Sequence, residues 1–197
     1  MAMRILAVST AVLLIFASPT WSQTSTDPSQ TGTVSPVPTI PESQIEPRTL
    51  STPYEFVATA DATSEFKILS GELAAQRAQS EEVKALAATT VEDHTSAQEA
   101  LRVAGEADEV EIAASSPDGE QQGLLDQLET AEGEEFDRLY VESQIFADQR
   151  AIAVFRGYQE GDTNFAQFAA DTVPTLVEHY GVALELAEEL GIGTPAQ

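Results

Sequence analysis

The chain contains no cysteine among its 197 residues. This absence excludes disulfide bonds, cysteine nucleophiles and thiolate metal sites, so stability must come from the core. The sequence also lacks a glycine-rich phosphate loop and a G-x-S-x-G nucleophile elbow. Together these absences argue against an enzyme.

Basic residues are scarce. Nine Lys and Arg face 33 Asp and Glu, which gives a formal net charge of −24 at pH 7. Nucleic acids and anionic membrane surfaces are bound by clustered Lys and Arg, so we expect neither as a partner. An acidic surface of this kind is more typical of a solubility device than of a cation store.

The first 22 residues have the pattern of a secretory signal peptide. Arg4 precedes an apolar run from Ile5 to Ala17, and small and polar residues follow up to Ser22. The run is shorter than the roughly 20 apolar residues that cross a bilayer. We therefore expect export to the periplasm or the extracellular envelope space, with no membrane span after cleavage; an uncleaved segment is the alternative.

Residues 23–51 are rich in Ser, Thr and Pro and have almost nothing to bury, which predicts a disordered linker. Residues 52–191 form one domain by the usual size of domains, and residues 192–197 form a short tail. Helical periodicity marks four long stretches in that domain, and no segment alternates like a strand. The stretches cover residues 53–78, 81–105, 133–160 and 163–191.

The fold class that we expect is therefore all-α, an antiparallel four-helix bundle. A crossover with one short helix around Leu124 to Leu128 would join the second and third long helices. Thr52 with Glu55 forms a candidate capping box, and Ser80 can cap the next helix. Pro174 predicts either a kink in the last helix or a break between a short helix and a long one.

Three polar residues lie inside apolar stripes that proceed by steps of four and three residues. His94 follows Val83, Ala87 and Thr90, and His179 follows Phe168, Thr172 and Leu176. Asp148 lies between Ile145 and Ile152 on the third long helix. Glu65 is close to the apolar side of the first helix, which we assign to Phe56, Phe66, Leu69 and Leu73. These placements predict a polar centre inside the bundle.

Several stretches resemble the DUF4142 family in order and spacing across residues 52 to 190. They are Phe56–Ala60, Glu72–Ala78, Val83–Ala87, Glu92–His94, Glu135–Val141 and Pro174–His179. The resemblance implies an exported, ferritin-like four-helix bundle whose biochemical role is not established. It also implies a departure, because the family's usual Asp-His pair on the third helix aligns with Ala147 and Asp148 here.

Two hypotheses for the polar centre stay open. In the first, Glu65, His94, Asp148 and His179 bind iron, manganese or zinc, with Asp93 and Glu178 supporting the ligands from the second shell. In the second, which we favour, Asp148 and Glu65 pair with the two histidines and with Arg150 in a buried structural cluster. Both hypotheses bring the two histidines together, and they differ in metal content.

A third hypothesis is an interaction module of the cell envelope. Its acidic faces would engage a basic protein partner or bind divalent cations weakly. Ser143, Thr90 and Thr172 could be considered as nucleophiles beside the histidines, but they lie on packed stripes, where small polar side chains pack or bond to their own helix.

Overall fold

The computed structural model describes residues 39–50, 52–159 and 163–192. The expected signal peptide, the first part of the expected linker and residues 193–197 lie outside these ranges. The described residues form five α-helices and one short 3-10 helix, and they contain no strand. The expected all-α class is thus confirmed. No described helix combines the length and the apolar character needed to cross a membrane.

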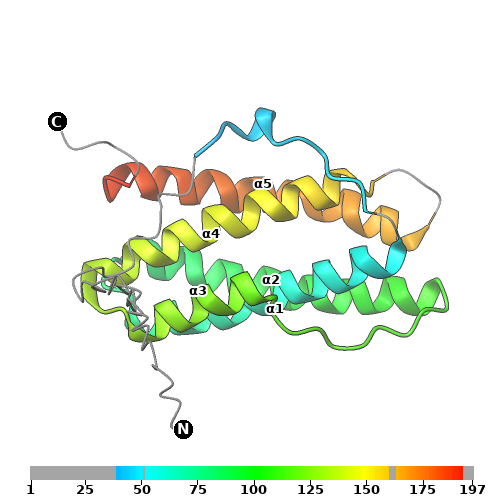
Figure 1. Ribbon diagram of the computed structural model, residues 1–197, viewed down its shortest axis with the longest axis horizontal. Coiled ribbons are helices and arrows are strands. Elements are labelled where there is room, and N and C mark those ends of the chain that lie inside the picture. Colours follow the sequence, from blue (N-terminus) through cyan, green and yellow to red (C-terminus); the bar gives the residue numbers. More distant parts are fainter. Residues whose placement is uncertain (1–38, 51, 160–162, 193–197) are drawn as a thin grey trace, which may run out of the picture. The chain divides into compact units, whose positions relative to one another are not determined.

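Four long helices pack side by side (Figure 1). Helix α1 packs against α2 and α4, and α5 packs against the same two helices. The shorter α3 belongs to the crossover between α2 and α4 and packs against α1 and α4. The helices comprise α1 (Pro53–Arg77), α2 (Glu81–Ala107), α3 (Gly119–Thr130), α4 (Gly133–Arg156) and α5 (Asn164–Glu189), and the 3-10 helix is η1 (Glu42–Gln44).

The helix starts follow the capping signals of the sequence. The Thr52 hydroxyl accepts from the backbone of Glu55, and the Glu55 carboxylate accepts from the backbone of Thr52, which completes the capping box. The Ser80 hydroxyl caps α2 by accepting from the backbone nitrogens of Glu82 and Val83, and the Thr163 hydroxyl caps α5. Helix α5 continues through Pro174 without ending there, so the expected break into two helices is absent.

The turn between α1 and α2 is anchored to α4 by one buried carboxylate. Asp137 accepts hydrogen bonds from the backbone nitrogens of Gln79 and Ser80, at 3.0 and 2.8 Å. These contacts satisfy turn donors that have no partner in either helix. They also join segments that are more than fifty residues apart in the sequence.

Helix α1 is buried on two faces. Phe56 and Ala60 belong to the main core, whereas Phe66 packs with Leu125 and Ala147 in a separate cluster beneath α3. The sequence had suggested a single apolar side running through Phe56 and Phe66. That assignment is wrong because the crossover helix covers a second face of α1.

Residues 39–50 pack on the outer side of α4 and α5. Ile45 is buried in the main core, and the Ile40 carbonyl accepts from the Tyr180 hydroxyl at 2.6 Å. The Arg156 guanidinium donates to the carbonyl oxygens of Glu42 and Ile45. The linker expected for residues 23–51 therefore wrongly included residues 39–50, which belong to the folded part. Their polar composition gave no sign of this, because side chains of the helices bind the segment through its backbone carbonyls.

Close approach of this segment makes Gly157 a sensitive position. A Cβ atom at Gly157 would overlap the backbone carbonyl of Arg48, although the conformation of Gly157 suits any residue. We expect Gly157→Ala to destabilise the protein by about 1–3 kcal/mol. Thermal unfolding, monitored by circular dichroism, measures the loss of stability.

The matched control is Gly181→Ala in the interior of α5, where a Cβ meets no atom within 4 Å. This change should stabilise the helix by up to about 1 kcal/mol, because alanine is the better helix former. Equal melting temperatures of the two variants would contradict the packing of residues 39–50 against Gly157.

Candidate functional site

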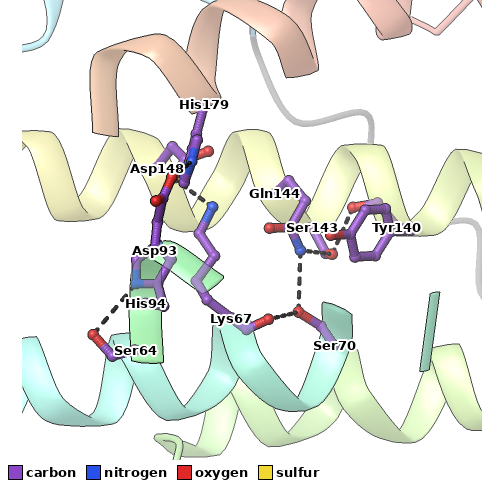
Figure 2. Close-up of polar contacts among 10 residues, drawn as sticks. All are labelled: Ser64, Lys67, Ser70, Asp93, His94, Tyr140, Ser143, Gln144, Asp148 and His179. Carbon is purple, nitrogen blue, oxygen red and sulfur yellow. Dashed lines mark hydrogen bonds and ion pairs between the residues drawn. The ribbon is translucent and has the colours of Figure 1, made fainter. Parts of the chain in front are cut away.

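The two histidines meet in the interior, as the sequence predicted. The ring centroids of His94 on α2 and His179 on α5 are 5.7 Å apart, and their planes are tilted by 44°. Each residue is 3 % exposed. Figure 2 shows the two rings beside Asp93, Lys67 and Asp148, so four helices contribute to one polar centre.

Lys67 and Asp148 form the centre's ion pair. The Lys67 Nζ atom of α1 lies 2.5 Å from an Asp148 carboxylate oxygen of α4, and both side chains are fully buried (Figure 2). No further hydrogen-bond partner of either charged group is found among the described residues. Each charge therefore depends on the other for compensation.

Burial and attraction act in opposite directions on this pair. Burial lowers the pKa of Lys67 and raises the pKa of Asp148, because each charged form loses its hydration. The attraction between the two groups opposes both shifts. Their ionisation is thus coupled, and neither group can be treated as an isolated acid or base.

His94 is held neutral. Burial lowers its pKa well below the ordinary value of 6.5, and the positive charge of Lys67 and the nearby His179 lower it further. Its Nδ1 atom lies 3.3 Å from the Ser64 hydroxyl of α1. Its Nε2 atom is buried and has no hydrogen-bond partner among the described residues.

His179 contacts the carboxylate that precedes His94. Its Nε2 atom lies 2.8 Å from an Asp93 oxygen, which links α5 to α2. The Asp93 side chain is 38 % exposed, so this end of the centre reaches solvent. The Nδ1 atom of His179 is buried and, like Nε2 of His94, finds no partner in the described part of the chain.

A second set of polar side chains lies between α1 and α4, next to the Lys67–Asp148 pair. The Gln144 amide donates to the Ser70 hydroxyl at 3.1 Å, and the Ser70 hydroxyl donates to the Lys67 carbonyl at 3.2 Å (Figure 2). Ser143 donates to the Tyr140 carbonyl. The hydroxyl of Ser143 therefore bonds within its own helix and is not activated by either histidine.

Three residues that the sequence assigned to the centre lie elsewhere. Glu65 accepts a hydrogen bond from Gln98 on α2 at 3.3 Å and is half-buried. Arg150 pairs with Asp118 and Glu120 at the start of α3. Glu178 is exposed on α5. In the described ranges, no group of three or more His, Asp and Glu side chains has an arrangement that could hold a metal ion.

Lys67 was the residue that sequence reasoning missed. Apolar periodicity on α1 pointed to its phenylalanines and leucines, whereas Lys67 lies on a stripe of small residues. That stripe proceeds by steps of four and three through Ala60, Ser64, Lys67, Gly71 and Ala74. Small residues at helical spacing allow close approach of helices, so this stripe was the available signal.

Comparison with known proteins identifies a family. The family model described as "Domain of unknown function (DUF4142)" matches residues 39–186. The chain belongs to the DUF4142 family. Comparison with curated proteins and with solved structures gave no match. The match begins within the segment that packs on α4 and α5, so this segment is part of the DUF4142 domain.

Replacing one member of the buried Lys67–Asp148 pair should lower the free energy of unfolding much more than replacing both members. We expect Lys67→Met and Asp148→Asn each to lower the free energy of unfolding by about 3–5 kcal/mol, because each leaves one buried charge uncompensated. The double variant should recover most of this loss. Urea unfolding measures all three.

The control is the other lysine of the chain, Lys84, which pairs with Glu81 on the surface. Lys84→Met should change stability by less than about 1 kcal/mol. Strictly additive losses in the Lys67→Met/Asp148→Asn variant would contradict the coupling.

The lowered pKa of His94 predicts acid sensitivity. As pH falls below 6.5, the unfolded chain protonates this histidine before the folded chain does. The free energy of unfolding should therefore decrease by up to about 1.4 kcal/mol per pH unit, until the lowered folded-state pKa is reached.

Urea unfolding of the wild type and His94→Gln at pH 7.5, 6.5 and 5.5 isolates this contribution, because all other groups titrate in both proteins. The variant should gain relative to the wild type as pH falls. A stability difference that is constant across these pH values would show that His94 ionises as it does in the unfolded chain.

Proposed function

We propose that this DUF4142 protein is an exported, non-catalytic helical bundle of the cell envelope and that its buried acid–histidine cluster is structural. The observation that carries the proposal is the contact of 2.5 Å between Lys67 and Asp148. It supplies the buried carboxylate with a positive charge from the protein itself. A cluster compensated in this way can specify how the helices pack without any ligand.

The Lys67 ammonium takes the position that a cation would need. A metal ion approaching Asp148 would meet a buried positive charge at contact distance, and the two charges would repel each other. Glu65, the expected fourth ligand, is engaged with Gln98. The expected four-residue set therefore does not fit a metal site unless Lys67 leaves Asp148.

We also propose a ferritin-like, four-helix arrangement and an envelope location. The first is supported by four long helices in mutual contact and by a crossover between α2 and α4 that carries α3. The second rests on Arg4 and the apolar run that follows it.

Metal binding is the second candidate function. It is favoured by the Nε2 atom of His94 and the Nδ1 atom of His179, two buried imidazole nitrogens that have no partner among the described residues. Imidazole suits iron, manganese and zinc. For this candidate the metal would be bound chiefly by the two histidines.

Elemental analysis decides between the two candidates. The full chain, purified without chelators or an affinity tag, is compared with the His94→Ala/His179→Ala variant. The structural proposal expects substoichiometric iron, manganese and zinc in both proteins and no metal-dependent rise in melting temperature. One equivalent of metal in the wild type that is lost from the variant would overturn it.

A further inference from the structure

Helices α2 and α5 leave two hollows along the surface where they meet. One has a volume of about 430 Å³ and lies between the second half of α2 and the first half of α5. The other has a volume of about 390 Å³ and lies between the start of α2 and the end of α5. His94 lines the first and His179 lines the second, and their ring centroids are 5.7 Å apart, so each hollow reaches the histidine pair.

The residues that line the hollows recur with a coiled-coil period. On α2 the lining residues alternate in steps of three and four through Leu86, Thr89, Asp93, Ser96, Ala100 and Val103. On α5 the same steps run through Phe168, Asp171, Thr175, Glu178, Val182 and Glu185. Two stripes with this period are the surface onto which a further helix packs. We call this surface the α2–α5 groove.

The floor and rim of the α2–α5 groove differ in chemistry. Val103 and Val182 are 52 % and 37 % exposed, and they are among the few large apolar side chains that face solvent in the described chain. The rim carries carboxylates, and none of the described residues lining either hollow is Lys or Arg. The rim carboxylates are those of Glu82, Asp93, Asp171, Glu178, Glu185 and Glu189.

The acidic character of the groove is not neutralised by its own helices. Helix α5 contains no Lys or Arg, and its His179 contacts one of the rim carboxylates, that of Asp93. On α2, Lys84 is paired with Glu81, and Arg102 is paired with Glu99 and Glu106. The groove therefore combines an apolar floor with a rim on which five of the six carboxylates form no ion pair among the described residues.

We propose that the α2–α5 groove binds a cationic amphipathic helix of another protein. Apolar side chains on one face of that helix would cover Val103 and Val182, and flanking Lys or Arg would meet the carboxylate rim. The groove extends along some 25 residues of each helix, so it accommodates a partner helix of roughly 37 Å. This inference goes beyond the structural role proposed for the buried cluster and does not depend on it.

Charge selects this occupant over two others. A second copy of the chain would bring a matching set of carboxylates against the same rim, and the two surfaces would repel each other. The part of this chain before residue 39 contains one basic residue, Arg4, which cannot match six carboxylates. A basic amphipathic helix can cover the apolar floor with one face and pair its Lys or Arg side chains with the rim carboxylates.

Fluorescence anisotropy of a labelled synthetic peptide tests the proposal with the full chain. The probe is a helix of about 21 residues, three heptads, with Leu at positions a and d and Lys at positions e and g. We expect saturable binding that weakens with added salt. A peptide of the same composition with shuffled positions should bind at least about tenfold more weakly, because it has lost its apolar stripe.

Paired variants locate the binding surface. Asp171→Lys with Glu185→Lys reverses two exposed rim charges and should weaken binding at least about tenfold. The control pair, Glu72→Lys with Glu134→Lys, makes the same change in net charge at exposed positions outside the groove and should weaken it less than about threefold. Thermal unfolding checks that all variants fold.

Val103→Ser with Val182→Ser keeps every charge and should also weaken binding, which keeps the proposal testable if the charge-reversed pair does not fold. Absence of saturable binding overturns the proposal. Equal binding of the shuffled peptide, or equal weakening by the control pair, reduces the interaction to general attraction by an acidic protein and overturns it too.

Discussion

A lysine and an aspartate removed from water hold the middle of the four long helices. Lys67 and Asp148 pair with each other and have no further hydrogen-bond partner in the described chain, so α1 and α4 must stay in the register that joins them. The neighbouring groups follow from this requirement. Small residues on α1 allow the close approach, Gln144 and Ser70 form a hydrogen bond next to the pair, and His94 stays neutral beside the positive charge.

Burying a lysine has particular weight in this composition. The chain has two lysines against 33 acidic residues, and one of the two is inside. A surface charge of this size repels itself and favours expansion of the chain. Because removal of either member alone leaves a buried charge behind, the interior pair ties α1 to α4 in one arrangement.

The parts of the fold that sequence reasoning predicted are those where apolar side chains and caps agree. The stripes through His94, Asp148 and His179 are buried as expected, and the caps at Thr52 and Ser80 begin their helices. The pairing within the centre could not be predicted, because periodicity places a residue on a face without naming the residue opposite. The burial of Lys67 was not predicted because its stripe on α1 consists of small residues, not large apolar ones. The packing of residues 39–50 was not predicted because their composition resembles that of a linker.

The carboxylate of Asp137 ties the hairpin of α1 and α2 to the beginning of α4. Two helical hairpins joined by a crossover could open as separate units, each protected to a different degree. Because the turn of the first hairpin depends on a buried acid of the second, opening either hairpin exposes polar groups in both. This contact therefore couples the opening of the two hairpins and favours unfolding of the domain as one cooperative unit.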